Sequence, residues 1–313
     1  MLRIHARRLL FVAVYGLVIT ACGASAASSP AGGRGDQIVA VGAENEYADV
    51  ISQIGGRYVR ATAVMSNPNT DPHAFEASPR IARTVSQAKL VVQNGVGYDD
   101  FMTKIASASP NASRKVIDVQ KLLGLPDSTR NPHLWYKPTT MPAVAAALVS
   151  DLSALQPAHA AYFRSNQRRF NASLQPWLDA LKVFRTRHPD TSVATTEPVA
   201  DDMLQAAGIT DVTPFSMQAD IMNGTDPAPQ AVTQQNDLLA AHRVMAFVYN
   251  QQVTDTVTQN FLTAATSAGV PVVGVYETMP TPGYDYQSWM MAELQAIGRA
   301  VTDRTSTEKL GVR

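Results

Sequence analysis

The stretch Pro157–His188, PAHAAYFRSNQRRFNASLQPWLDALKVFRTRH, decides how this chain is organised. Its apolar residues keep roughly helical spacing, and Pro157 can open a helix at its first turn. A continuous helix here would be ~48 Å long at about 1.5 Å per residue, far above the usual ~11 residues. Pro176 lies inside the stretch and predicts a kink or a division, because proline lacks the N–H of a helical hydrogen bond.

On both sides of this helix, short apolar runs alternate with amphipathic stretches. The alternation predicts βαβ units and mostly parallel sheets. We expect strands at Ile38–Val41, Val59–Met65, Leu90–Gln93, Val116–Val119, Val193–Thr196, Val212–Phe215, Met245–Tyr249 and Val272–Val275. We expect helices at Tyr47–Ile54, Pro79–Gln87, Asp99–Ser107, Val199–Ala207, Pro229–Ala241, Thr254–Ala268 and Tyr286–Val301. The predicted fold class is α/β, with two lobes of mostly parallel sheets joined by one long linker helix that limits closure to a small tilt.

The amino-terminal segment predicts export. Arg3, Arg7 and Arg8 precede an apolar run of about 12 residues, which is too short for the ~20 residues of a membrane span. Residues 19–22, Ile-Thr-Ala-Cys, resemble a bacterial lipobox, in which Cys22 becomes the lipidated first residue of the mature protein. The alternative is an ordinary signal peptide with an incidental cysteine. We therefore predict a signal peptide over 1–21, a flexible tether over 22–36, an N-terminal α/β lobe over 37–156, a linker helix over 157–188 and a C-terminal α/β lobe over 189–313.

Composition excludes several classes of protein. The 313 residues include 26 basic and 26 acidic ones, and the basic residues are scattered, whereas a nucleic-acid binder needs a basic stripe. A single cysteine excludes disulfide scaffolds, zinc fingers and iron–sulfur proteins. Without residues 1–21 the chain has 23 basic and 26 acidic residues, so the mature form is slightly acidic. The nucleotide and hydrolase motifs GxGxxG, GxxxxGK[ST], GxSxG and HExxH are absent.

Two histidines share one local pattern. His73 follows Asp71-Pro72 and His133 follows Asn131-Pro132, each in a loop after a predicted strand of the first lobe. Proline restricts the backbone around it, so each imidazole is expected to be held on a stiff loop. Asp71 and Asn131, or backbone carbonyls, are candidates to hydrogen-bond the far nitrogens of the two rings.

Two glutamates occupy equivalent places in the second lobe. Glu197 ends the run SVATTE and Glu277 ends PVVGVYE, each at the carboxyl end of an apolar strand. Ligands of open α/β sheets bind in the crevice beyond such strand ends, and burying an unpaired carboxylate costs several kcal/mol. The alternative is that each glutamate caps a following helix. Two histidines and two glutamates from opposite lobes would form an N2O2 site for a divalent transition ion.

Three motifs give a specific resemblance: DPHAFEASP over 71–79, AKLVVQNGVG over 88–97 and NPHLW over 131–135. They resemble the cluster A-I metal-binding lipoproteins of bacterial ABC importers, the zinc/manganese solute-binding family, and the similarity runs from about Ile38 to Val301. The resemblance implies a periplasmic-binding-protein-like fold and one metal ligand from each of four loops. The matching positions are His73, His133, Glu197 and Glu277.

The same resemblance implies what the protein does and where. It implies a solute-binding protein rather than an enzyme, which captures a metal ion outside the membrane and passes it to an ABC permease. Cys22 would carry the lipid anchor to the bacterial cell membrane, and we expect a monomer. The imidazoles must be neutral to bind, so metal affinity should fall as the pH drops.

Departures from the family pattern bear on the choice of metal. The fourth ligand is often aspartate in the family, whereas Glu277 is one methylene longer. Zinc members often carry a histidine-rich loop, absent here, and commonly use a third histidine where this chain has Glu197. Two histidines with two carboxylates resemble the manganese (or iron) subgroup, so Mn²⁺ is slightly favoured as the ligand, although Zn²⁺ generally binds such sites more tightly.

Three other functions stay open at this point. One is a metal-dependent surface adhesin. Another is a haem or siderophore binder, which shares the stiff helix but should have a wider, more aromatic or basic cleft. The third is a metallohydrolase, which needs an open coordination position and a general base, and no unassigned acid has an obvious claim to that role.

Overall fold

The computed structural model of this chain describes residues 37–69, 75, 78–280 and 282–311. The predicted signal peptide, the tether with Cys22, and the loop residues Asp71 and His73 lie outside these described residues. No helix within the described ranges is long and apolar enough to cross a membrane.

The first lobe is built on a parallel sheet of four strands. These are β1 (Ile38–Glu44), β2 (Val59–Met65), β3 (Leu90–Gln93) and β4 (Lys115–Asp118), in the order β2-β1-β3-β4. Its helices are α1 (Asn45–Gly55), α2 (Pro79–Gln87), α3 (Asp100–Ala108), α4 (Val119–Leu122) and α5 (Thr140–Leu155), with short 3-10 turns η1 (Gly56–Tyr58), η3 (Leu134–Tyr136) and η4 (Pro157–His159). Because β2 lies at the edge of the sheet, on the far side of β1, strands β1 and β3 are direct neighbours. Their carboxyl ends therefore lie side by side.

The second lobe repeats this topology. Its parallel strands β5 (Ser192–Thr195), β6 (Thr210–Asp211), β7 (Ala246–Asn250) and β8 (Val272–Val275) lie in the order β6-β5-β7-β8. Its helices are α7 (Asp201–Ala206), α8 (Phe215–Met222), α9 (Pro229–Ala240), α10 (Thr256–Ser267) and α11 (Tyr286–Asp303). The predicted α/β class with two mostly parallel sheets is confirmed.

One predicted strand of the second lobe is wrong. The run Val212–Phe215 was expected to be extended, but β6 contains only Thr210–Asp211 and Phe215 begins α8. The strand lies at the edge of the sheet, and Pro214 directly precedes the helix, where its fixed φ is compatible with a helix start. In the first lobe, the sequence does not predict helix α5.

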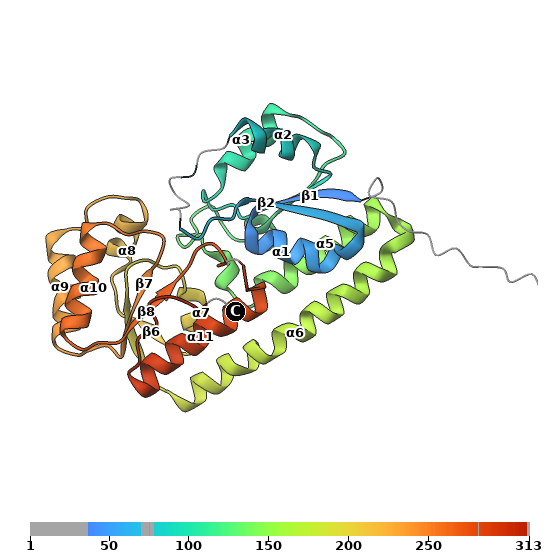
Figure 1. Ribbon diagram of the computed structural model, residues 1–313. Helices are drawn as coiled ribbons and strands as arrows, with labels where there is room; N and C mark the ends of the chain where they lie inside the picture. Colours follow the sequence, from blue (N-terminus) through green and yellow to red (C-terminus); the bar gives the residue numbers. More distant parts are fainter. Residues whose placement is uncertain (1–36, 70–74, 76–77, 281, 312–313) are drawn as a thin grey trace, which may run out of the picture.

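Helix α6 (Ala160–Arg187) runs unbroken for 28 residues along both lobes (Figure 1). Of the two outcomes expected at Pro176, a kink or a division, the division is wrong. Both Pro176 and Ala172, whose carbonyl loses its helical partner, are exposed, so water can satisfy that carbonyl. The buried face of the helix packs continuously against the lobes through Phe163, Phe170, Leu174, Trp177, Leu181 and Phe184.

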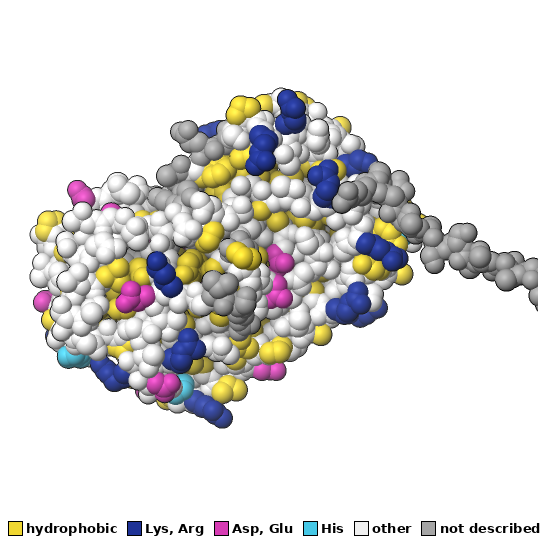
Figure 2. Space-filling model, viewed as in Figure 1, with side chains coloured by type: hydrophobic (Ala, Val, Ile, Leu, Met, Phe, Trp, Pro, Cys, Tyr) yellow, Lys and Arg dark blue, Asp and Glu magenta, His cyan; other side chains and the backbone are white. Residues whose placement is uncertain are grey.

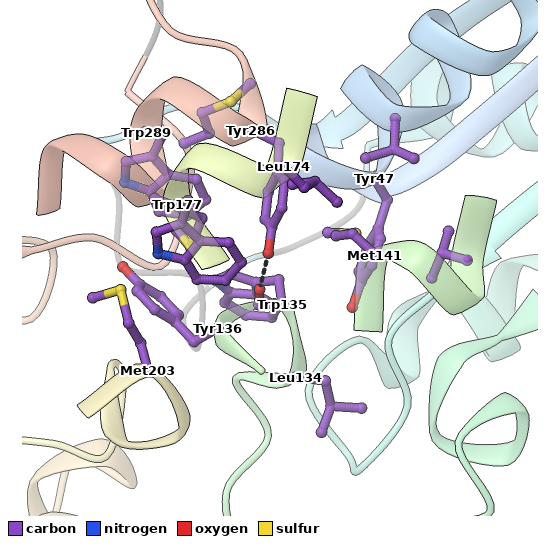
Figure 3. Close-up of a cluster of buried hydrophobic side chains, with 14 of the residues drawn as sticks. Tyr47, Leu134, Trp135, Tyr136, Met141, Leu174, Trp177, Met203, Tyr286 and Trp289 are labelled. Atoms are coloured by element: carbon purple, nitrogen blue, oxygen red, sulfur yellow. Dashed lines mark hydrogen bonds between the residues drawn. The ribbon is translucent and has the colours of Figure 1, made fainter. Parts of the chain in front are cut away.

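A buried aromatic cluster joins the two lobes to this helix (Figure 3). Trp135 and Tyr136 come from the first lobe, Trp177 from α6, and Tyr286 and Trp289 from α11, and each is at most 1% exposed. The Tyr286 hydroxyl donates to the backbone oxygen of Trp135 at 2.6 Å. Because Trp135 follows His133 by two residues, this cluster also anchors the loop that carries His133.

On the face shown in Figure 2, lysine and arginine side chains are spread over the surface, mostly among uncharged side chains. This is the scattered arrangement that the sequence indicates.

A capping box begins α10, and its removal has a predictable cost. The Asp255 carboxylate accepts from the Thr258 backbone N–H at 2.7 Å, and the Thr258 hydroxyl accepts from the Asp255 N–H at 2.8 Å. Asp255→Ala is expected to lower the free energy of unfolding by about 1 kcal/mol, the usual cost of losing an N-cap. Urea unfolding measures this loss; an unchanged midpoint would show that the cap is not stabilising.

Candidate metal centre

The two predicted glutamates lie at the same edge of the second sheet. Glu197 follows the last residue of β5 by two positions, and Glu277 follows the last residue of β8 by two positions. Strand β7 runs between β5 and β8 and ends at Asn250. The Asn250 amide nitrogen donates to Oε1 of Glu197 at 3.1 Å and to Oε1 of Glu277 at 2.5 Å.

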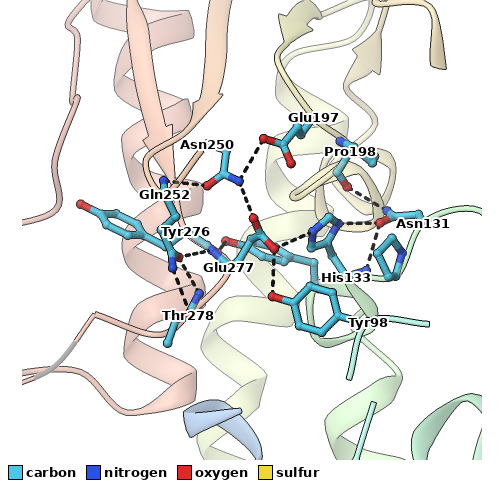
Figure 4. A network of polar contacts seen from close by, with 12 residues as sticks. Tyr98, Asn131, His133, Glu197, Pro198, Asn250, Gln252, Tyr276, Glu277 and Thr278 are labelled. Atoms are coloured by element: carbon cyan, nitrogen blue, oxygen red, sulfur yellow. Dashed lines mark hydrogen bonds and ion pairs between the residues drawn. The ribbon is translucent and has the colours of Figure 1, made fainter. Parts of the chain in front are cut away.

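His133 brings the first lobe to this edge (Figure 4). Its Nε2 lies 3.2 Å from Oε2 of Glu277, and both side chains are 0% exposed. The Tyr98 hydroxyl, from the loop after β3, donates to the same Glu277 oxygen at 2.8 Å. Glu277 is therefore one point where side chains of both lobes meet.

Asn131 determines how the His133 ring is oriented. Its Oδ1 lies 2.8 Å from Nδ1 of His133 and accepts the His133 backbone N–H at 3.0 Å. Its amide nitrogen donates to the Pro198 carbonyl at 2.8 Å, which fixes the oxygen toward the imidazole. A carbonyl oxygen only accepts, so Nδ1 carries a hydrogen and Nε2 faces Glu277. The expected contact between Asn131 and the far ring nitrogen is present.

The structure brings three of the four predicted ligands into one hydrogen-bonded network. His133 and Glu277 touch, and Asn250 connects Glu277 to Glu197. Among the residues that the structure describes, no three His, Cys, Asp or Glu side chains converge closely enough to hold a metal ion. The fourth predicted ligand, His73, lies outside them.

Glu197 does not cap a helix in this structure. The helix that follows it, α7, begins at Asp201 and has no side-chain cap. Glu197 is 3% exposed and points to Asn250 instead. The helix-cap alternative is therefore not what the structure shows for this residue.

Several polar residues of this network were not predicted. Gln252 accepts the backbone N–H groups of Glu277 and Thr278, both at 2.7 Å, and so holds the loop after β8. Asn45, directly after β1, makes two hydrogen bonds with the Met279 backbone and ties the lobes together, accepting from its N–H at 3.0 Å and donating to its carbonyl at 2.8 Å. Asn250 also lies at the carboxyl end of an apolar strand, but it is neutral, so its burial there is less unusual than that of a carboxylate.

Two further glutamates are buried beside the network. Both Glu44 and Glu46 are 0% exposed. Burial raises the pKa of both carboxyls well above the ordinary value, and the nearby charge of Glu277 adds to this for Glu46. Burial therefore favours the neutral form of both carboxyls.

Asp99 is a third buried acid of the first lobe. Its carboxylate accepts the backbone N–H groups of Asn94 and Gly95 at 2.6 and 2.9 Å. Burial nevertheless raises the pKa of Asp99 to about 6, against the lowering effect of these hydrogen bonds. The two hydrogen bonds of Asp99 hold the backbone of Asn94 and Gly95 in the loop before Tyr98, and Tyr98 in turn contacts Glu277.

Two known proteins of related sequence are named as manganese lipoproteins. Manganese-binding lipoprotein MntA of Bacillus subtilis (strain 168) is 26% identical over 163 residues, 50% of this chain and 52% of that protein. Manganese ABC transporter substrate-binding lipoprotein PsaA of Streptococcus anginosus is 24% identical over 177 residues, 53% of this chain and 55% of that protein. The chain thus spans about half the length of these curated relatives.

Solved structures share the fold. The solute-binding protein FpvC of Pseudomonas aeruginosa in complex with Mn²⁺ has a TM-score of 0.70 at 21% identity, covering 86% of this chain and 99% of FpvC. A crystal structure of ZnuA also has a TM-score of 0.70 at 21% identity, covering 85% of this chain and all of that one.

A family model assigns the chain as a whole. The model described as zinc-uptake complex component A, periplasmic (ZnuA) matches residues 41–300, which include nearly all of both sheets, the long helix and all four predicted ligands. This family consists of solute-binding proteins and not of enzymes. The chain belongs to the ZnuA family of metal-binding solute-binding proteins of ABC transporters.

Proposed function

We propose that this protein captures a divalent transition metal, Mn²⁺ or Zn²⁺, in the interlobe cleft and delivers it to an ABC importer. The ligands in this proposal are His73, His133, Glu197 and Glu277. The observation that carries it is the buried contact between Nε2 of His133 and Oε2 of Glu277, which joins an imidazole of one lobe to a carboxylate of the other. A metal between such groups would hold the two lobes together.

The surroundings of these residues support metal capture over the other candidate functions. The contact of His133 with Glu277 is closed, with both side chains 0% exposed, whereas a haem or siderophore would need a wide cleft at this point. Asn131 leaves Nε2 of His133 directed at Glu277, as a ligating imidazole requires. Proton and metal compete for this nitrogen, so affinity should fall with decreasing pH.

The ligand types bear on which metal is carried. Two carboxylates suit Mn²⁺ better than further imidazoles would, so Mn²⁺ is slightly favoured as the transported ion. Zn²⁺ is nevertheless expected to bind more tightly at equilibrium, as the general affinity order of divalent metals predicts.

The proposal also covers how the protein is placed. The signal peptide over 1–21 would be removed, Cys22 lipidated, and residues 22–36 would tether the lobes to the outer face of the cell membrane. The lobes over 37–156 and 189–313, joined by the helix over 157–188, would act as a monomer beside the permease. An adhesin role is a separate function that a cell-binding assay with metal-free protein can test.

Metal analysis of the mature chain tests the proposal. Protein stripped of metal and equilibrated with Mn²⁺ or Zn²⁺ is expected to retain one ion per chain after dialysis, measured by elemental analysis. In competition, Zn²⁺ is expected to displace Mn²⁺ because it forms the stronger complex with nitrogen and oxygen donors. A chain that retains neither ion would contradict the proposed function and reopen the haem or siderophore alternative.

A further inference from the structure

We propose that the amino-terminal edge of the first sheet is a membrane-contact surface, which binds anionic lipid headgroups and holds the first lobe on the membrane. We call this surface the basic edge, and it consists of Arg57, Lys89, Arg114 and Lys115. The inference goes beyond metal capture and uses one part of the proposed function, the placement of the chain beside the membrane. The basic edge lies opposite the carboxyl ends of the same strands, where the candidate metal centre lies.

The parallel topology gathers basic residues that are scattered in the sequence. Arg57 lies two residues before β2, Lys89 directly precedes β3, and Lys115 begins β4. The Gln37 side chain donates to the Arg57 carbonyl at 2.9 Å, and the Lys115 N–H donates to the Lys89 carbonyl at 2.9 Å. Across four neighbouring strands, these backbones fall within about 15 Å of one another.

The positive charge of the basic edge is not neutralised by ion pairs. Arg57, Lys89 and Lys115 are exposed, and none of them forms an ion pair with a described acidic side chain. Arg114 donates to three backbone carbonyls, which leaves its charge in place. Burial raises the pKa of Asp151 on α5, and the charge of Lys115 opposes this shift, so Asp151 offsets part of the charge of one lysine. The local excess of positive charge attracts anionic headgroups.

Aromatic and apolar side chains lie beside the charges. The rings of Tyr58 and His159 stack with their centroids 3.7 Å apart. The Arg57 Cζ atom lies 4.9 Å from the ring centroid of Tyr58 and 5.4 Å from that of Tyr162. Val116, the second residue of the edge strand β4, is 49% exposed. Tyrosine is enriched at membrane interfaces, so these side chains suit the headgroup region of a bilayer.

The tether meets the folded lobes at the same edge. Gln37 leads directly into β1, so residues 22–36 connect the proposed anchor Cys22 to the basic edge. A chain of this length reaches at most about 50 Å when fully extended. Anchoring therefore gives the edge a high effective concentration at the membrane, where a weak electrostatic contact is sufficient. In Figure 1, β1, β2 and the start of α6 lie together at the right-hand end, and Figure 2 shows lysine and arginine side chains there.

Binding to lipid vesicles tests the inference. The mature chain is used without lipidation, so that the result does not depend on the anchor. The probes are vesicles of phosphatidylcholine alone and vesicles in which about half of the lipid is phosphatidylglycerol. Co-sedimentation at low and at high salt measures how tightly the protein binds each kind.

The variants change three exposed charges at a time. The edge variant is Arg57→Glu, Lys89→Glu, Lys115→Glu, and a milder form carries Gln at the same three positions. The matched control changes three exposed basic residues elsewhere, in the second lobe and at the end of α6, by the same net charge: Arg187→Glu, Arg243→Glu, Lys309→Glu.

We expect the unaltered chain to bind the anionic vesicles more than about tenfold more tightly than the neutral ones at low salt, and to lose this preference at high salt. The mature chain is slightly acidic, so its net charge does not account for such a preference. The edge variant should lose the preference, the glutamine form should reduce it, and the control should keep it.

Three results overturn the inference. The first is equal binding of the unaltered chain to both kinds of vesicle, and the second is an equal loss in the edge variant and the control. The third is binding to vesicles only when they contain the permease, because the edge would then contact a protein. Metal retention is measured on the same samples: a chain that binds anionic vesicles but no metal contradicts only the proposed function, and the reverse result contradicts only the membrane contact.

Discussion

Replacing Glu277 by alanine is expected to lower the affinity for Mn²⁺ and Zn²⁺ by more than about 100-fold. Loss of a residue that merely supports a metal ligand typically costs 10- to 100-fold, and loss of the ligand itself should cost more. Glu277 is also the residue at which His133, Tyr98 and Asn250 meet, so its removal takes away the carboxylate that connects the two lobes. Competition titration against a chelator of known affinity measures the effect.

Glu293→Gln is the matched control for this experiment. Glu293 is likewise a fully buried carboxyl close to the loop after β8, because it accepts the Tyr276 backbone N–H at 3.2 Å, but the proposal gives it no role in binding. Its variant should bind metal with unchanged affinity. The double variant His73→Ala, Glu277→Ala should bind no metal in the same assay, and wild-type affinity in that variant would contradict the proposed ligand set.

Much of the fold could be predicted from the sequence because its signals are local. Strands Val59–Met65 and Val272–Val275 and helix Pro79–Gln87 match the structure residue for residue. Helix α6 was predicted from its spacing, but its continuity past Pro176 depends on which face of the helix is exposed. That face is fixed by packing against both lobes, which no local pattern shows.

The candidate site could be predicted only in part for a related reason. Glu197 and Glu277 stand out because an acid after an apolar strand is unusual. Asn250 is neutral and gives no such signal, and its contact with both glutamates follows only from the strand order β5-β7-β8. The pairing of His133 with Glu277 likewise joins residues 144 positions apart and depends on how the lobes face one another.

Glu293→Gln is expected to make the protein more stable than the unaltered chain at alkaline pH. The Tyr136 hydroxyl donates to the Tyr276 carbonyl at 2.7 Å and lies 2.5 Å from Oε2 of Glu293. A hydroxyl has one hydrogen and cannot donate fully to both acceptors, so a proton on the Glu293 carboxyl would relieve this competition. Its other oxygen accepts from Trp289 Nε1 at 2.6 Å. Glutamine can make the same contacts, with an N–H in place of the O–H.

The pH dependence follows from the pKa of Glu293, which burial raises from 4.5 to about 8. The folded state thus holds a proton that the unfolded chain has already released, and stability present below about pH 4.5 is lost as the pH rises through about 8. Glutamine cannot lose this proton. The variant should therefore match the unaltered chain near pH 5 and exceed it by a few kcal/mol near pH 9.

Urea unfolding of both chains across this pH range measures the difference. Asp99 and Asp201, whose pKa values burial raises to about 6 and about 8, change the stability of both chains in the same direction. The difference between the two chains therefore isolates Glu293. A difference that does not vary with pH would show that Glu293 is already ionised in the fold, and the hydrogen-bond argument for its proton would then be wrong.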